Sequence, residues 1–157
     1  MSFFGSLNIS ASALTAQRLR MDLISENIAN VDTTRAANGG PYQRRTPLFE
    51  EVQGSFDDYL NEAFFAGTAI EADVLGSDGR MGLGVRVASI ATDGTPGMRK
   101  YEPAHPDADA DGYVVMPNVN IVTEMVNMIS ASRSYEANVT ALGGTKTMIA
   151  KTMEIGR

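Results

Sequence analysis

Two long apolar stripes at helical spacing, one at each end of the 157-residue chain, constrain the fold most. The N-terminal stripe is broken only at Ser10 and Gln17, and its apolar members are Phe3, Leu7, Leu14, Met21, Ile24, Ile28 and Val31. The C-terminal stripe is broken only at Ser132 and Lys146, and it consists of Ile121, Met125, Met128, Tyr135, Val139, Leu142, Ile149 and Met153. Alternating steps of four and three predict helices that pack against partner helices.

Neither stripe forms a core by itself. At about 1.5 Å per residue, each helix would be several tens of ångströms long, far more than a small globular domain requires. The first helix is predicted from about Phe3 to Val31, and a polar run over residues 32–41 ends it. The last helix is predicted to begin near residues 118–120, where an Asn side chain can cap its first turn.

The segment between the stripes favours short strands. Residues 42–52 are typical of an extended edge segment, because Pro47 removes one backbone donor from its middle. A clearer strand at residues 85–90 is followed by turn residues at 93–97 and by a second extended stretch at 98–101. This arrangement predicts a hairpin between the two stretches.

Two further segments affect the predicted topology. A short strand at residues 113–116 is ended by Pro117, whereas residues 54–79 fit a helical face and a loop equally well. Gly143 and Gly144 interrupt the last helical pattern, and each costs roughly 1 kcal/mol relative to Ala. Either the helix bends there or another backbone approaches closely, and we favour the bend.

We therefore predict a mainly α protein with a small β-rich middle module. Its long N- and C-terminal helices would pack as an antiparallel coiled-coil pair, because both leave the same middle segment. The predicted divisions are residues 1–34, 35–117 and 118–157. A single helix pair leaves apolar side chains exposed, and their burial would drive association with further chains. These side chains are Phe4, Ile9, Leu19, Leu23, Val122, Val126 and Ile129.

Charge and composition narrow the function classes. A net charge of -6 argues against nucleic acid, because phosphate binding requires a basic surface. The first basic residue is Arg18, and no apolar stretch approaches the length of a membrane span. We therefore expect neither a cleaved signal peptide nor direct membrane insertion.

An acidic run resembles the opening of a calcium loop but lacks the remaining features. Asp107, Asp109, Asp111 and Gly112 match the alternating carboxylates and the glycine of such a loop. Its twelfth position is Asn118, where a bidentate Glu belongs, and prolines upstream leave no entering helix. A solvated acidic turn is the favoured interpretation.

Two other motifs resemble parts of catalytic or cofactor sites. His105 is the only histidine, and it stands between Pro103 and Pro106 without a serine elbow, which favours an ordinary loop residue. Gly82 and Gly84 begin a dinucleotide-like pattern that lacks its third glycine, so the start of a strand is favoured. We expect no enzyme activity, no cofactor and no metal.

Several stretches are similar to a known family. Residues 12–21 (SALTAQRLRM) and 27–34 (NIANVDTT) resemble the N-terminal motif of bacterial flagellar rod, hook and hook-associated axial proteins. Residues 112–120 (GYVVMPNVN), 124–129 (EMVNMI) and 132–139 (SRSYEANV) are more specific, and they resemble the proximal-rod members of that family.

The resemblance implies a structural subunit of the proximal rod of the flagellar basal body, in the periplasm, that packs through its helices into a hollow helical tube. It implies export by the flagellar type III apparatus without cleavage. The implied partners are other copies of the chain, other flagellar rod proteins and the MS-ring/rod junction. In this reading Asn27, Asn30 and Asp32 fix the helix exit through side-chain to backbone bonds. The implied assembly interface comprises Leu7, Leu14, Met21, Ile24, Ile28, Val31, Met125, Met128, Tyr135, Val139, Leu142, Ile149 and Met153.

One alternative function stays open at this point. A soluble coiled-coil adaptor could dimerise through the same stripes without polymerising. For a rod subunit, in contrast, we expect helical ends that are largely disordered before incorporation, because isolated stripes cannot offset the entropy of ordering.

Overall fold

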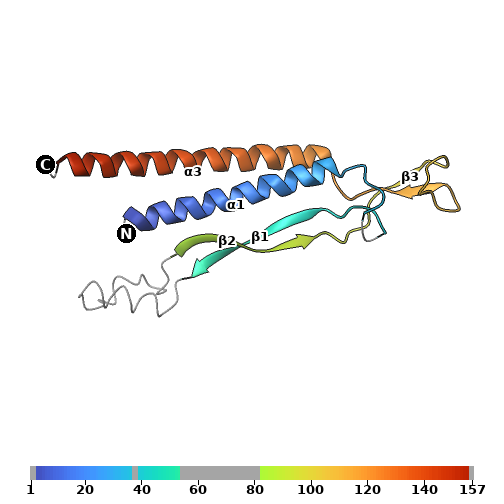
Figure 1. The fold of residues 1–157 in the computed structure, drawn as a ribbon. Coiled ribbons are helices and arrows are strands. Elements are labelled where there is room, and N and C mark those ends of the chain that lie inside the picture. The colour runs from blue at the N-terminus through green and yellow to red at the C-terminus, as the bar shows by residue number, and fades with distance from the viewer. Residues whose placement is uncertain (1–2, 37–38, 54–81, 156–157) are drawn as a thin grey trace.

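The computed structural model describes residues 3–36, 39–53 and 82–155 of the chain. The elements follow one another as α1 (Phe3–Ala29), β1 (Arg45–Gln53), β2 (Gly82–Thr92), β3 (Arg99–Tyr101), β4 (Tyr113–Val115) and α3 (Ile121–Ile155). Two long helices at the ends of the chain and a small two-sheet β region between them agree with the predicted fold class (Figure 1). The ambiguous segment 54–79 lies outside the described residues.

Both long helices form where the apolar stripes predicted them. α1 ends slightly before the predicted Val31, and α3 begins directly after Asn120. The Oδ1 atom of Asn120 accepts a hydrogen bond from the backbone N–H of Thr123 at 3.2 Å. This is the side-chain cap expected at the start of the last helix.

α3 is continuous through Gly143 and Gly144. Figure 1 shows no bend along its length, so the bend that we favoured is wrong. Apart from the nearby backbone of α3 itself and the adjoining residues, a methyl group added at either glycine would meet no atom within 4 Å. Within the described part of the chain, therefore, no neighbouring backbone explains the two glycines.

The strands pair differently from the prediction. β1 pairs antiparallel with β2, from Arg45 opposite Thr92 to Gln53 opposite Gly82, and β3 pairs antiparallel with β4. The hairpin predicted between residues 85–90 and 98–101 is therefore wrong. The reason is that β2 forms its strand hydrogen bonds with β1. A further bond from the Asp93 N–H to Arg44 O at 2.8 Å extends this pairing into the turn.

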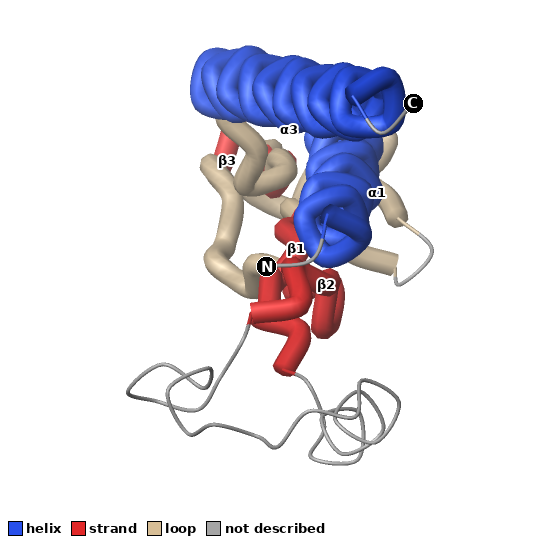
Figure 2. Tube along the Cα trace, turned by 90° about the vertical axis from the view of Figure 1, so that its left-hand side faces the viewer, coloured by secondary structure: helices blue, strands red, loops and turns tan. Residues whose placement is uncertain are grey.

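α1 forms the middle layer of the molecule. It contacts α3 on one side and the β1–β2 pair on another, whereas α3 has no such contacts with β1 or β2. Figure 1 shows the two helices running in opposite directions, and Figure 2 shows the same order of layers from the side. The β3–β4 pair projects beyond the end at which α1 finishes and α3 begins.

A close contact attaches β2 to α1. The hydroxyl of Ser12 donates to Ile9 O at 2.7 Å and accepts from the backbone N–H of Val85 at 3.1 Å. Gly84 has a φ of 119°, and a Cβ atom there would collide with Ser12 Oγ. Glycine is needed at this position because of both its backbone conformation and the short distance to the helix.

The described core is small. Its buried apolar side chains are Ala16, Leu23, Ile24, Tyr42, Val114 and Ala131. The predicted exposure of Leu23 is wrong, because α1 has packing partners on more than one side. The prediction of exposure is confirmed for Val122, Val126 and Ile129, which are 70%, 59% and 55% exposed.

Candidate functional site

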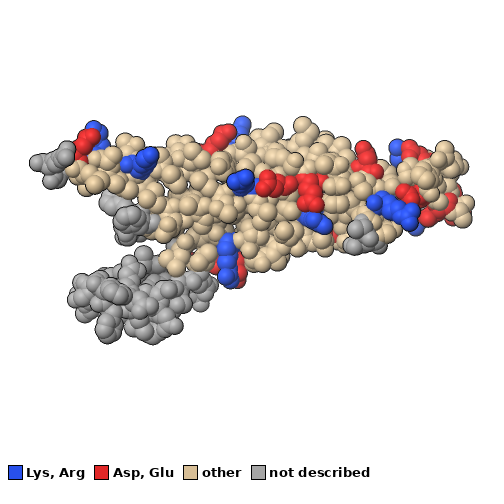
Figure 3. All heavy atoms as spheres, in the orientation of Figure 1, with Lys and Arg blue, Asp and Glu red and all other residues tan. Residues whose placement is uncertain are grey.

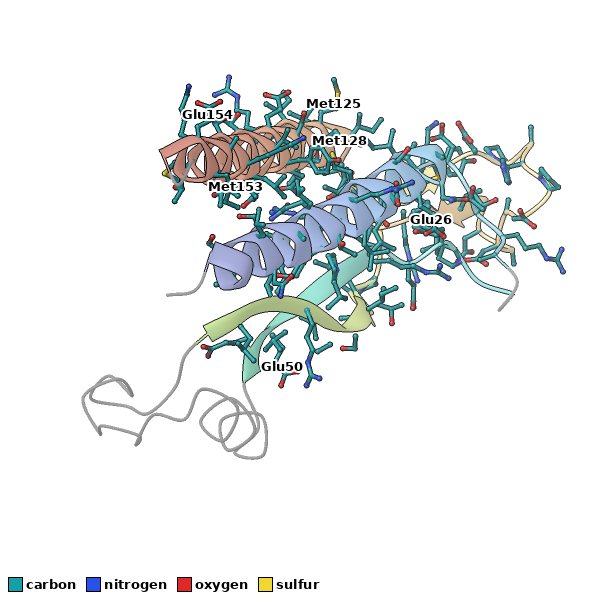
Figure 4. All side chains as sticks on the ribbon, turned by 60° about the vertical axis from the view of Figure 1, so that its left-hand side comes forward. Glu26, Glu50, Met125, Met128, Met153 and Glu154 are labelled. Carbon is teal, nitrogen blue, oxygen red and sulfur yellow. The ribbon has the colours of Figure 1, made fainter. Side chains whose placement is uncertain are left out.

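The predicted interface residues lie on both helices but differ in exposure. In α1 and the turn after it, Ile24 is buried, and the partly buried ones are Leu7, Leu14, Met21, Ile28 and Val31. In α3 the partly buried ones are Met128, Tyr135, Leu142 and Ile149, and the exposed ones are Met125, Val139 and Met153. Figure 4 shows Met125 and Met128 near the start of α3 and Met153 near its end.

The more buried side of α3 is displaced by one residue from the predicted stripe at every second position. Glu124 and Ala131 are buried, and Asn138 and Thr145 are partly buried. The predicted stripe instead placed residues 125, 132, 139 and 146 on this side, and each of the more buried residues comes directly before one of them. The apolar pattern misses these four residues because they are small or polar. Together with the partly buried Met128, Tyr135, Leu142 and Ile149 they still follow alternating steps of four and three residues.

An outer patch of apolar side chains covers the first turns of α3. We define it by Ile121, Val122, Met125, Val126 and Ile129, each of which is at least 45% exposed. Their spacing places them on adjacent turns of one broad helix face. The only charged residue among residues 121–132 is the buried Glu124, and Figure 3 shows an uncharged stretch along this part of α3.

A polar cluster with a buried centre at Asn27 and Glu124 joins the end of α1, the start of β1 with the residues before it, and the start of α3. We call it the polar clasp and define it by Asn27, Tyr42, Arg44, Arg45 and Glu124. The Asn27 Nδ2 atom donates to Arg45 O at 2.9 Å and to Glu124 Oε2 at 3.2 Å. Its Oδ1 atom accepts from the Arg45 N–H and the Tyr42 hydroxyl, both at 2.9 Å. The hydrogen-bonding capacity of the amide is therefore filled.

The Glu124 carboxylate is 1% exposed and is neutralised inside the clasp. Its Oε1 atom accepts from Arg44 Nε at 2.9 Å and from Arg44 Nη2 at 2.7 Å. Asn127, on the same helix, donates to the same oxygen at 3.4 Å. These bonds satisfy both carboxylate oxygens, and a carboxylate buried without such partners would be strongly destabilising.

Tyr42 closes the clasp on the side of the β region. It is buried, and burial raises the pKa of its hydroxyl above the ordinary 10.0, with the Glu26 carboxylate adding to the effect. The neutral hydroxyl is the form that donates to Asn27 Oδ1. The Arg45 guanidinium lies 5.9 Å from the centre of the Tyr42 ring and pairs with Glu26 at 2.9 Å.

The residues expected to fix the helix exit have different surroundings. Asn30 donates to Glu26 O at 2.9 Å, and its Oδ1 atom accepts from the Thr33 hydroxyl at 3.2 Å. Asn27 acts across the fold instead, on the backbone of Arg45. Asp32 is exposed and makes no hydrogen bond to the described residues, so no contact supports its expected role.

The loop motifs weighed as chemical sites carry structural bonds. His105 Nδ1 accepts from the Asp107 N–H at 3.1 Å, and Asp107 Oδ2 accepts from the Thr34 hydroxyl at 2.9 Å. Gly112 adopts a φ of 77° in the turn before β4. Across the described ranges, no group of three or more His, Asp or Glu side chains is placed to hold a metal ion. Gly82 is the first residue of β2, as expected for the start of a strand.

No helix in the described part of the chain combines the length and the apolar character needed to cross a membrane.

Sequence reasoning did not identify the polar clasp. Arg44 and Glu124 are far apart in the chain, and the residues around Glu124 are mostly apolar, so the apolar stripe dominates the pattern there. An acidic residue isolated among apolar neighbours was the one available signal, because such a residue requires a partner when it is buried.

Comparisons with known families agree with the two helical ends. Residues 7–36 match the family described as "Flagella basal body rod protein". Residues 110–155 match the family described as "Flagellar basal body rod FlgEFG protein C-terminal". The first match spans most of α1 and the turn that follows it, and the second spans β4 and α3.

Full-length relatives carry one common description. The chain is 48% identical to a flagellar basal-body rod protein FlgC from Borreliella burgdorferi, with 99% of this chain and 98% of the relative covered. It is 46% identical to FlgC of Bacillus subtilis and 36% identical to FlgC of Salmonella typhimurium, with both chains fully covered in each comparison.

Proposed function

The chain belongs to the FlgC family of flagellar basal-body rod proteins and is a structural subunit of the rod rather than an enzyme, and from this premise we propose how it assembles. In our proposal α1 and α3 pack as an antiparallel coiled-coil pair, and pairs from successive subunits build the hollow helical tube of the proximal rod. The observation that carries the proposal is the outer patch on α3, which a lone subunit leaves exposed. Heterologous contacts that do not close produce such a tube.

The helix residues divide into two roles in this proposal. The partly buried members of the seam, such as Leu14 and Leu142, hold the pair together. The exposed members Met125, Val139 and Met153, together with the outer patch, contact neighbouring subunits. Burial of exposed apolar area stabilises such contacts by about 25 cal/mol per Å².

The proposed location is the periplasmic rod. The subunit would be exported by the flagellar type III apparatus without a cleaved signal peptide. Its proposed partners are other copies of itself, other flagellar rod proteins and the MS-ring/rod junction. The soluble adaptor is not favoured, because the full-length relatives carry the name of a rod protein.

Two aspartate substitutions test the assembly. Val139→Asp places a charge on an exposed helix position, and Ile28→Asp places one on a partly buried position. In a strain that lacks the chromosomal copy, we expect both variants to abolish swimming and to be missing from isolated basal bodies. Normal motility of either variant would contradict the proposal.

A matched control introduces the same charge outside the helices. Ala104 is exposed in the turn between β3 and β4, so Ala104→Asp is expected to preserve motility. Circular dichroism of the purified Val139→Asp chain should equal that of the parent, because the substituted side chain is half exposed in the isolated subunit. This result would separate an assembly defect from a folding defect.

A further inference from the structure

The free sides of the two long helices carry complementary charges. We propose that α1 of a second copy of the chain covers the outer patch of α3, and that two ion pairs between the copies fix the register of this contact. The two pairs join Arg18 to Glu136 and Asp22 to Arg133. The inference rests on the proposed rod assembly and names the partner of the outer patch.

α1 leaves one narrow side exposed in the isolated subunit. The exposed residues follow one another at alternating steps of three and four, so they lie on one face of the helix. We call this the free face of α1 and define it by Asn8, Ala11, Thr15, Arg18, Asp22, Ser25 and Ala29. Apart from Arg18 and Asp22, its side chains are short and uncharged, so a second helix can approach it closely.

The side of α3 that faces away from its own α1 is free as well. Figure 2 shows α3 as the outermost layer, and among the described elements α3 contacts only α1. Val126 and Ile129 of the outer patch are followed, at steps of four and three residues, by the exposed Arg133 and Glu136. This side of α3 is therefore apolar near its start and charged in the turns that follow.

The charged residues on these two faces lack partners in the subunit. All of them are exposed, and none forms an ion pair with another described residue. A similar charge step near the end of α3 is closed on itself, because Lys151 pairs with Glu154 at 2.9 Å. Arg133 and Glu136 are therefore the charges of α3 that are available to a neighbouring chain.

Both proposed ion pairs fit one antiparallel contact. Copies that point the same way along a tube present α1 of one copy to α3 of the next in opposite directions, as within the subunit (Figure 1). Arg18 lies one turn before Asp22, and Glu136 lies about one turn after Arg133, so the two pairs of opposite charges meet together. Complementary charges of this kind set the register of a helix contact and disfavour misaligned ones.

The same register brings the outer patch onto the free face of α1. Ala29 comes seven residues after Asp22, and Val126 comes seven residues before Arg133, so these two residues lie opposite each other. Val126 is 59% exposed in the isolated subunit, and the short side chain of Ala29 leaves room for it. The contact therefore covers apolar surface that the subunit cannot cover by itself.

The register also gives the two glycines of α3 a neighbour. Ala11 comes eleven residues before Asp22, and Gly144 comes eleven residues after Arg133, so these positions lie opposite each other. No contact within the described chain explains Gly143 and Gly144. Between copies, their missing side chains and the small Ala11 let the two backbones come close.

Charge exchange tests the partner in a strain that lacks the chromosomal copy. We expect Arg133→Asp and Asp22→Arg, each alone, to lower the amount of the chain in isolated basal bodies by about tenfold, because like charges then face each other. The double variant restores opposite charges, and incorporation should return to within about twofold of the parent. Single variants without effect, or a double variant no better than either one, would overturn the inference. Assembly through the outer patch could still hold, because another rod protein could cover it.

The second charge step of α3 supplies a matched control. Lys151→Asp removes a cation that already has a partner on its own helix. Alone, it should leave incorporation within about twofold of the parent, as expected for an exposed ion pair. Combined with Asp22→Arg, it should not restore incorporation. Restoration by Lys151→Asp in place of Arg133→Asp would overturn the inference, because the register would then be a different one.

Disulfide trapping distinguishes a second copy from other partners. The chain contains no cysteine, so copies that carry Ala29→Cys and Val126→Cys separately can be linked to each other only at these two positions. Oxidation of basal bodies from a strain that expresses both variants should give a linked pair of this chain, because a disulfide requires Cα atoms within about 7 Å. Neither variant expressed alone should give one. Absence of the linked pair from basal bodies that contain both variants would overturn the inference.

Discussion

The side-chain amide of Asn27 binds the backbone of Arg45 as the edge of a neighbouring strand would, donating to its carbonyl and accepting from its N–H, both at 2.9 Å. This pair of bonds docks the first residue of β1 onto the end of α1. Because the same amide also donates to Glu124 Oε2, one side chain connects three segments of the chain.

Asn27→Asp should be strongly destabilising. The substitution removes both bonds donated by Nδ2 and places a second carboxylate beside Glu124 in the interior. We expect a loss of about 3 kcal/mol in the free energy of unfolding, measured by urea denaturation. Asn30→Asp is the control, because Asn30 donates only to Glu26 O, and it should cost less than about 1 kcal/mol. Equal losses would contradict the prediction.

Arg44, just before β1, and Arg86, in β2, should differ in their contributions to stability. Arg44→Met leaves the buried Glu124 without its cation, and we expect the free energy of unfolding to fall by about 3 kcal/mol or more. Arg86→Met removes an exposed pair with Glu50, whose side chains are 64% and 52% exposed, and should change stability by less than about 1 kcal/mol. Thermal or urea unfolding of the two variants side by side provides the measurement. Similar unfolding midpoints for the two variants would show that burial of an ion pair does not decide its contribution to stability.

Gly84→Ala should loosen the contact between β2 and α1. An alanine there would have an unfavourable positive φ, and its methyl group would collide with the Ser12 hydroxyl. We expect a loss of about 1 to 3 kcal/mol in unfolding free energy. Gly94→Ala is the matched control, because no atom lies within 4 Å of its added methyl group, and stability should stay within about 0.5 kcal/mol. A larger effect at Gly94 than at Gly84 would refute this account.

The turn after β2 should respond to acid through Asp93. Its Oδ1 atom accepts from the Thr95 hydroxyl at 2.6 Å and from the Thr95 N–H at 3.0 Å, and these bonds hold the pKa of Asp93 below its ordinary 3.8. The pKa of Asp93 is lower in the folded chain than in the unfolded chain. The stabilisation that its two bonds provide is therefore fully present above the ordinary pKa of 3.8, and it is lost as the pH falls through the folded pKa.

Thr95→Val tests this assignment. The variant keeps the backbone donor but loses the hydroxyl, so the pKa of Asp93 should rise toward 3.8 in a titration followed by carboxyl ¹³C NMR. The lowered pKa of Glu102, which results from its bond with Lys100, should stay where it is. An unchanged Asp93 titration would assign the shift to another cause.

The long helices and the cap of α3 were accessible from the sequence because their determinants are local. Apolar spacing placed both helices, and the Asn run before residue 121 placed the start of α3. Pro47 correctly marked an edge segment, since β1 pairs with only one strand in the described sheet. The hairpin prediction failed because turn residues at 93–97 show where the chain bends but not which strand becomes the partner.

Heptad spacing and turn chemistry act over a few residues, and by themselves they determined that the chain has two long helices with short strands between them. Only the tertiary structure decided the pairing of β1 with β2, the burial of Leu23 and the one-residue displacement of the inner side of α3. The physical reason is that Glu124 and Asn27 are polar and are buried only because Arg44, Tyr42 and the Arg45 backbone meet them there. Partners brought together from distant segments leave no periodic signal in the sequence of either one.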